Sequence, residues 1–212
     1  MSKFIIKHIT KTAEDTNLAS FITGSIKNWL DPTQLASIPD RLFKGTQLKE
    51  AIFTNCNYVA PEAFANCYNL TTISFPKLDV VQQNTFLNCS DIKSAKFGNL
   101  YSIGNSAFYG CTKLDRLDDI SACGYIGQSA FGATGIQSIS LTASQVGYYA
   151  FNYCQNLSYV NLLSCSAGEY YYCFQNCTNL THIVLPSTVR DGYNTVYFYA
   201  TFSGDTKLSS II

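Results

Sequence analysis

Residues 103–114 read IGNSAFYGCTKL, and the chain repeats this stretch in altered form along most of its length. The copies begin at phenylalanines, most of which stand 20 to 23 residues apart. A fixed period of this size is typical of a solenoid, whose units bury their apolar faces against their neighbours. The other copies are FKGTQL (43–48), FANCYNL (64–70), FLNCSDI (86–92), FGATGI (131–136), FNYCQNL (151–157), FQNCTNL (174–180) and FSGDTKL (202–208).

A short alternation of apolar and polar residues follows most copies, as in LTTISF (70–75) and LTHIVL (180–185). Such alternation over four to six positions is typical of a half-buried strand. We therefore expect parallel strands that begin near residues 48, 70, 92, 114, 136, 157, 180 and 208.

An aliphatic residue stands five positions before the phenylalanine in most units, as Ile103 does before Phe108. The space between the two accommodates one turn of helix at most, so each unit is predicted to run strand, turn, short helical turn. The repeated phenylalanines are predicted to stack as one buried column. These are Phe64, Phe86, Phe108, Phe131, Phe151 and Phe174.

The pattern LxxIxL followed by I-G-x-x-A-F-x-x-C-x-x-L resembles the leucine-rich repeats of the BspA-like (Treponema pallidum type) family, and SIGNSAFYGCTKL (102–114) is close to its consensus. The resemblance implies an α/β repeat solenoid: a right-handed leucine-rich repeat with a parallel β-sheet on the concave face and short helical turns on the convex side. It also implies a surface protein that binds host proteins, or a phage-associated one. Glu169, at an aliphatic position, and an insertion at 189–200 depart from the pattern.

The repeats predict a single domain, with a solenoid of about eight units over residues 35–212 and a capping segment over residues 1–34. The strand-like KFIIKHI (3–9) belongs to this cap, and its apolar piece is too short for a signal peptide. The chain is therefore expected to be cytoplasmic, mature, or part of a longer protein. Its end, KLSSII (207–212), falls inside a predicted strand, so either the natural protein continues or this open end pairs with another chain.

Charge and hydropathy exclude several classes of function. The chain has 14 basic and 14 acidic residues without a Lys/Arg cluster, which argues against nucleic-acid binding. No apolar run approaches the roughly 18 residues of a membrane span. We therefore expect neither a nucleic-acid partner nor membrane insertion.

Five of the nine cysteines occupy one repeat position, three residues after the phenylalanine: Cys67, Cys89, Cys111, Cys154 and Cys177. At another repeat position cysteine alternates with leucine, so a reduced, apolar core role is the simplest interpretation. A zinc site would need paired ligands, for which Cys173 and Cys177 are the nearest approach. Disulfides between neighbouring units stay open, because adjacent strands lie within disulfide range.

Catalysis finds little support in the sequence. The two histidines, His8 and His182, lie in no nucleophile or metal motif, and His182 should project from its strand into solvent. We therefore predict a protein that is not an enzyme, with no catalytic, cofactor-binding or metal-binding residues and no cofactor.

The outward side chains suggest recognition. Residues 120–168 contain no charged side chain, and ten of the 15 tyrosines lie between residues 148 and 199. Tyrosine is favoured at recognition surfaces, although half or more of these could instead pack on the convex side. The candidate partner-binding residues are Arg116, Tyr159, His182, Tyr193, Tyr197 and Tyr199.

Two functions follow as expectations. The first is a non-enzymatic recognition or adhesion module that binds a protein or glycan partner through the solenoid surface, which the family resemblance favours. The alternative is a structural or assembly component, for example of a phage particle, that uses the open ends of the solenoid. By the resemblance, the location would be the cell surface, the secreted fraction or a phage particle.

Overall fold

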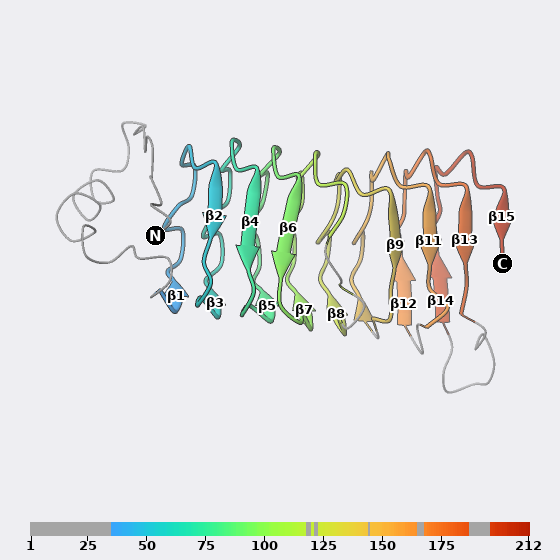
Figure 1. The fold of residues 1–212 in the computed structure, drawn as a ribbon. Helices are drawn as coiled ribbons and strands as arrows, with labels where there is room; N and C mark the ends of the chain where they lie inside the picture. The colour runs from blue at the N-terminus through green and yellow to red at the C-terminus, as the bar shows by residue number, and fades with distance from the viewer. Residues whose placement is uncertain (1–34, 118–119, 121–122, 144, 165–167, 187–195) are drawn as a thin grey trace.

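The computed structural model describes residues 35–117, 120, 123–143, 145–164, 168–186 and 196–212. The predicted cap, residues 1–34, lies outside the described residues, as does Cys165. Figure 1 shows a solenoid whose coils stack one after another, each coil contributing strands to two rows. Strands of one row pair in parallel with their counterparts in the next coil, as expected from the repeat.

The front row of strands arises from the alternating segments, and its members begin within about two residues of the predicted positions. Inward residues such as Ile73 and Ile183 are buried, while outward ones such as Ser94 and His182 are exposed. A three-stranded sheet and a four-stranded sheet make up this row. Its strands are β2 (Glu50–Ile52), β4 (Thr72–Phe75), β6 (Ser94–Phe97), β9 (Ser138–Ser140), β11 (Tyr159–Asn161), β13 (His182–Val184) and β15 (Ser210–Ile211).

The predicted strand near residue 114 lies partly outside the described residues. By the repeat, the counterpart of β6 and β9 would span residues 116–119, and residues 118–119 are not described. The backbone of this coil is bonded to the next one, because the Gln137 N–H donates to the Asp115 carbonyl (3.3 Å), as the Ser158 N–H does to the Gln137 carbonyl one coil later (2.9 Å).

A lower row of short strands was not predicted. Each ends at or near the aliphatic residue that precedes the phenylalanine, such as Ile103, whose side chain is fully buried. Its strands are β1 (Ser37–Ile38), β3 (Tyr58–Val59), β5 (Val80–Val81), β7 (Ser102–Ile103), β8 (Tyr125–Ile126), β10 (Gln145–Val146), β12 (Gly168–Tyr171) and β14 (Val196–Tyr199). The sheet β5-β7-β8-β10 runs through four successive coils.

The predicted helical turns do not form, and the described residues contain no helix. In their place each coil has a phenylalanine run, defined here as the residues from three before to three after the repeated phenylalanine. Alternate N–H groups of a run donate to the next coil: Phe86 to the Ala107 carbonyl (2.9 Å) and Asn88 to that of Tyr109 (2.7 Å). The remaining N–H groups bond within the coil, as Cys89 does to the Phe86 carbonyl (3.2 Å). The runs thus form their own ladder along the solenoid.

This alternation requires left-handed backbone at two places in each run, two residues before and two residues after the phenylalanine. Around Phe108 these residues are Ser106 (φ 52°) and Gly110 (φ 76°). Glycine reaches this region without a steric penalty, and asparagine reaches it more readily than most residues. Accordingly Asn66, Asn88 and Asn176 occupy the second place in other coils.

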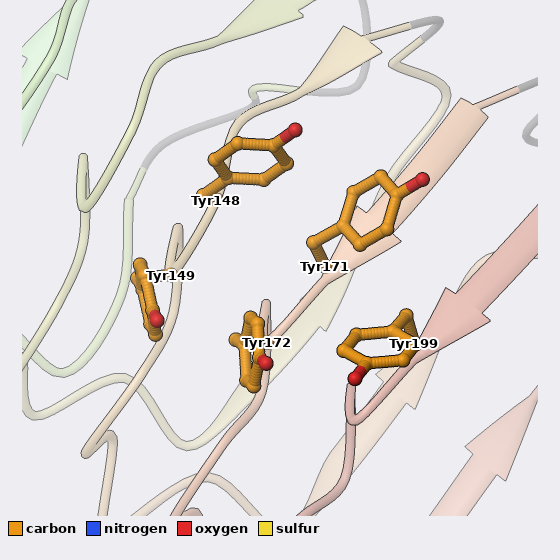
Figure 2. Close-up of a pocket in the computed structure, with 5 residues that line it drawn as sticks. All are labelled: Tyr148, Tyr149, Tyr171, Tyr172 and Tyr199. Carbon is orange, nitrogen blue, oxygen red and sulfur yellow. The ribbon is translucent and has the colours of Figure 1, made fainter.

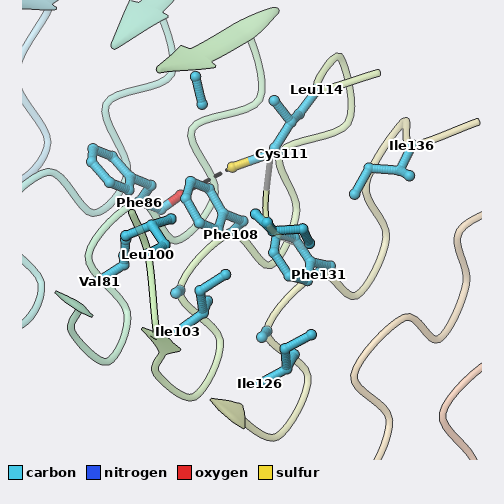
Figure 3. Packing of buried hydrophobic residues seen from close by; sticks show 14 of the residues in the cluster. Val81, Phe86, Leu100, Ile103, Phe108, Cys111, Leu114, Ile126, Phe131 and Ile136 are labelled. Atoms are coloured by element: carbon cyan, nitrogen blue, oxygen red, sulfur yellow. Dashed lines mark hydrogen bonds between the residues drawn. The ribbon is translucent and has the colours of Figure 1, made fainter. Parts of the chain in front are cut away.

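The interior is organised by the predicted phenylalanine column, which is confirmed. Phe86, Phe108 and Phe131 are fully buried and stack with ring centroids 5.3 and 5.4 Å apart (Figure 3). Successive rings stack in this way from Phe43 to Phe202.

The column of cysteines lies beside the phenylalanines, and the core interpretation is confirmed. All eight described cysteines are free and buried. The Cys111 thiol donates to the Phe86 carbonyl of the preceding coil (3.2 Å), drawn as a dashed line in Figure 3. The same bond recurs at Cys67, Cys89, Cys154 and Cys177. Each thiol therefore fills a small apolar space and satisfies a carbonyl that would otherwise have one partner fewer.

Candidate functional site

The sequence-predicted binding residues are divided among different parts of the molecule. Tyr159 of β11 and His182 of β13 are register partners on the front row, and both are exposed. Arg116 is exposed one coil before Ser138 of β9, the strand that pairs with β11. The front face therefore brings Tyr159 and His182 together as neighbours, and Arg116 is adjacent to neither.

The other three predicted residues belong to the last lower-row strand or precede it. Tyr193 lies outside the described residues. Tyr197 and Tyr199 belong to β14, which pairs with β12. Tyr199 is 59% exposed and lies in a different sheet from Tyr159 and His182.

Tyr199 forms part of a pocket with four tyrosines that sequence reasoning did not select. The pocket has a volume of about 370 Å³, and the five side chains that line it are all tyrosines. We call it the tyrosine groove: Tyr148, Tyr149, Tyr171, Tyr172 and Tyr199 (Figure 2).

The repeat explains how these tyrosines meet. Tyr148, Tyr171 and Tyr199 each stand three residues before the repeated phenylalanine of successive coils, and Tyr149 and Tyr172 stand two residues before it. Stacking of the coils therefore places equivalent side chains side by side in two rows. In the third coil the second row ends, because Ala200 takes the equivalent place.

Neighbouring rings of the groove contact one another at different angles. Tyr149 and Tyr172 stack with centroids 5.0 Å apart and planes 15° apart. Tyr148 and Tyr171 meet edge to face, at 5.0 Å and 87°. The Tyr199 ring lies nearly perpendicular to that of Tyr172 (5.6 Å, 82°; Figure 2). It therefore lies across the end of the row formed by Tyr149 and Tyr172, which stops there because the next residue at that repeat position is Ala200.

Backbone hydrogen bonds between coils fix the spacing of the two rows. The Tyr149 N–H donates to the Tyr171 carbonyl (3.2 Å), and the Tyr172 N–H donates to the Tyr199 carbonyl (3.1 Å). Two residues further along each run, the Phe151 N–H donates to the Cys173 carbonyl and the Phe174 N–H donates to the Thr201 carbonyl. The groove is therefore built on the ladder of the solenoid and is preformed.

Two of these tyrosines occupy strained backbone. Tyr149 (φ 60°) and Tyr172 (φ 56°) are left-handed, where a bulky side chain costs on the order of 1 kcal/mol. Three other coils place smaller polar residues there, Asn84, Ser106 and Ser129, and two place the longer Arg41 and Glu62. The backbone conformation therefore does not require tyrosine at these two positions.

The groove is neutral and mostly apolar, with phenolic hydroxyls as the polar groups of the side chains that line it. Tyr148 is 51% exposed, and Tyr149, Tyr171 and Tyr172 are half-buried. Partial burial, together with the neighbouring Tyr199, raises the pKa of Tyr172 above its ordinary value, so its hydroxyl keeps its proton near neutral pH. The groove can thus offer ring faces and neutral hydrogen-bond donors.

Within the described part of the chain, no three His, Cys, Asp or Glu side chains gather into a group that could hold a metal ion. Nor does any helix there have the length and apolar character that a membrane span requires. His182 is exposed, and its Nδ1 lies 2.8 Å from the Thr181 hydroxyl.

A sequence signal for the groove existed in the doublets of GYYAF (147–151) and EYYYCF (169–174). Counting back from each phenylalanine puts both doublets at the same repeat positions, and Tyr199 joins them in the next coil. The third tyrosine of the second segment differs, because Tyr170 is 1% exposed and belongs to the core. The sequence does not show which positions the run turns outward, so it could not tell these tyrosines apart.

The fold defines a repeat protein of the leucine-rich class, built from parallel strands that stack coil upon coil. The family model of the BspA type leucine rich repeat region matches residues 15–137 and 121–212, in six copies. The chain belongs to this family. No curated protein matches it.

Solved structures of leucine-rich repeat proteins share the fold. A leucine-rich repeat protein from Bacteroides ovatus is 26% identical, with a TM-score of 0.72 over 84% of this chain and 46% of that one. A leucine rich cell surface protein from Faecalibacterium prausnitzii is 22% identical, with a TM-score of 0.53 over 82% of this chain and 55% of that one. The chain thus spans about half the length of the structures that it matches.

Proposed function

We propose that this chain is a non-enzymatic recognition module that binds a protein partner through the tyrosine groove. The observation that carries the proposal is the repetition of tyrosine at one outward position in three successive coils, next to two tyrosines held in left-handed backbone. Membership of the leucine-rich repeat family supports a protein-interaction module. Aromatic anchors usually carry a large share of the binding energy at protein interfaces.

A location on the cell surface agrees with this proposal. The related protein from Faecalibacterium prausnitzii is described as a cell surface protein. Adhesion to a host or neighbouring cell would then be the biological use of the groove. Tyr159 and His182, on the front row, provide a second surface for a partner that reaches around the coil. Tyr193, Tyr197 and Arg116 stay candidate contacts for the same partner.

A display selection with a random peptide library tests the proposal. The library is panned against the wild-type chain, and each recovered peptide is measured against the double variant Tyr148→Gln, Tyr172→Asn. Gln128 and Asn84 occupy these repeat positions in other coils, so both changes suit the fold. We expect recovered peptides to lose affinity for the double variant and to retain it for Tyr101→Asn, a change at an exposed tyrosine of another coil.

Peptides that bind both variants as tightly as the wild type would refute the groove as the contact. Peptides that instead lose affinity for Tyr159→Ala and His182→Ala would move the site to the front row. A particle mass that rises with protein concentration, together with an empty selection, would replace recognition by the assembly role.

A further inference from the structure

We propose that the tyrosine groove binds a proline-rich segment in the polyproline II conformation. This inference rests on the proposed function, since it names the kind of peptide that the groove takes. It starts from the shape of the site: two rows of rings run along the solenoid, and Tyr199 closes the row at Ala200 (Figure 2). A ligand in such a groove lies along the stacking direction and meets one equivalent ring in each coil.

The periods of the groove and of polyproline II agree. Paired strands of successive coils lie about 4.8 Å apart, so every second coil is about 9.6 Å away. A polyproline II helix repeats every three residues, or about 9.3 Å. Residues i and i+3 of the ligand would therefore present the same face to Tyr148 and Tyr199, which lie two coils apart. An extended β-strand repeats about every 6.7 Å, which matches neither one coil nor two.

The hydrogen-bonding groups of groove and ligand are also complementary. Polyproline II has no internal hydrogen bonds, and proline has no N–H, so such a segment presents carbonyl acceptors and apolar rings. The side chains that line the groove are tyrosines, whose hydroxyls can donate to those carbonyls and whose faces can pack against pyrrolidine rings. A charged ligand would leave its ionised groups without a partner of opposite charge among these side chains.

The lack of charged side chains in the groove also favours a proline-rich peptide over other ligands. The lining side chains include no carboxylate and no basic group, and residues 120–168 contain no charged residue. A nucleic acid or other polyanion therefore finds no cation among the lining side chains. A glycan would bury many hydroxyl groups against a lining with few polar atoms. Aromatic-lined grooves are known to take rigid proline-rich segments, whose preformed conformation lowers the entropy lost on binding.

Fluorescence anisotropy with a labelled decaproline peptide tests the proposal on the whole chain. We expect saturable binding that changes little with salt, and no saturable binding of a Gly-Ser peptide of equal length. Tyr148→Gln and Tyr172→Asn should each weaken decaproline binding by about tenfold, because each removes an aromatic anchor. Tyr101→Asn should leave it unchanged. Melting temperatures confirm that every variant is folded.

The proposal is overturned if decaproline binds no better than the Gly-Ser peptide, or if both groove variants bind decaproline as the wild type does. Tetramethylammonium and a cello-oligosaccharide serve as competing probes. If either binds in a manner that depends on Tyr148 and Tyr172 while decaproline does not, the polyproline ligand is wrong, yet the groove remains a recognition site. Panning of the random peptide library then decides the proposed function independently.

Discussion

Each cysteine of the buried column is a small apolar residue with one weak donor. Cys111 illustrates the role, because its side chain is fully buried and its thiol donates to the carbonyl of Phe86. In the coils of Phe43 and Phe131 a threonine takes the same place, and its hydroxyl donates to the phenylalanine carbonyl of its own coil (2.8 Å). Thr46 and Thr134 are also buried, so seven coils fill this position with a small side chain that has a donor.

Buried thiols in this column should be inert in the folded state. Burial raises the pKa of Cys111 far above its ordinary value, and burial also raises the pKa of Cys123, to about 11. The thiolate is the reactive form, so labelling by a maleimide should be slow until the chain unfolds. Mass spectrometry of native and denatured samples measures this difference at each site. Rapid labelling of Cys111 in the native protein would contradict the buried column.

Asp205 occupies the cysteine position in the coil of Phe202 and gives the molecule a pH dependence. Its Oδ1 accepts a hydrogen bond from the Cys177 N–H (2.7 Å), while its Oδ2 is buried without a hydrogen-bond partner. Burial raises the pKa of Asp205 from 3.8 to about 7. The folded chain thus binds this proton more tightly than the unfolded chain, so the associated stability is fully present below about pH 4 and is lost as the pH rises through about 7.

We expect Asp205→Asn to remove this contribution to the pH dependence. The amide oxygen can still accept from Cys177, and no charge has to be buried at high pH. The variant should be more stable than the wild type at pH 8, and the difference should shrink toward pH 4. Urea unfolding across this range measures it, with the exposed Asp115→Asn as the control. A wild-type pH profile in Asp205→Asn would show that another group is responsible.

At the scale of the element, the phenylalanine run depends on close contact between coils. A Cβ added at Gly127 would lie 2.6 Å from the backbone nitrogen of Asn105 in the preceding coil. At Gly124, three residues earlier, the nearest atom to such a Cβ is the Tyr101 carbonyl oxygen at 3.8 Å. The two glycines therefore have different roles, although both lie in the same coil.

A matched pair of substitutions separates these roles. Gly127→Ala should destabilise the fold by about 1–3 kcal/mol, because the backbone of two coils must move apart. Gly124→Ala should stay within about 0.5 kcal/mol of the wild type. Thermal or urea unfolding measures both. Equal stability of the two variants would mean that the coils approach less closely at Gly127 than the structure indicates.

The sequence predicted some elements well and others poorly, for physical reasons. Alternation over LTTISF and LTHIVL was long enough to define front-row strands, since one face of each is buried. A run such as GNSAFYG was too short to separate a helical turn from paired left-handed residues by periodicity. Serine and glycine at 106 and 110 were the available signal, because left-handed backbone favours small residues. Likewise, Tyr149 and Tyr172 could be assigned to a surface only once the run was known to turn them outward.

At the scale of the whole molecule, the coil of Phe108 lies in the middle of the stack and is bonded to both neighbours. The lower row runs through β7 and β8, the runs are bonded from Phe108 to Ala130 (2.8 Å), and Phe108 stacks between Phe86 and Phe131. In a repeat protein each unit contacts only its neighbours, so the two sides of the solenoid interact through this coil.

Phe108→Ala should therefore have two effects. It should lower the free energy of unfolding by about 3–5 kcal/mol, as is usual for truncation of a buried phenylalanine. It should also broaden the unfolding transition more than Phe64→Ala does, because Phe108 lies in the middle of the stack and Phe64 near its N-terminal end. Calorimetry compares the two variants. An unchanged melting temperature for Phe108→Ala would contradict the stabilising role of the column.

The outward and inward positions of the phenylalanine run are independent of each other, and this has a consequence for how such chains acquire new specificities. Phe131 and Ala130 face the interior, whereas Gln128 is exposed and Ser129 half-buried directly before them. Two residue positions per coil thus determine the surface, and the neighbouring positions determine the fold. Gln128→Tyr with Ser129→Tyr would lengthen the tyrosine groove by one coil toward the N-terminus and leave the interior side chains as they are. The length of the groove, and with it the length of the segment that the chain can contact, is set by how many successive coils carry the same outward pair.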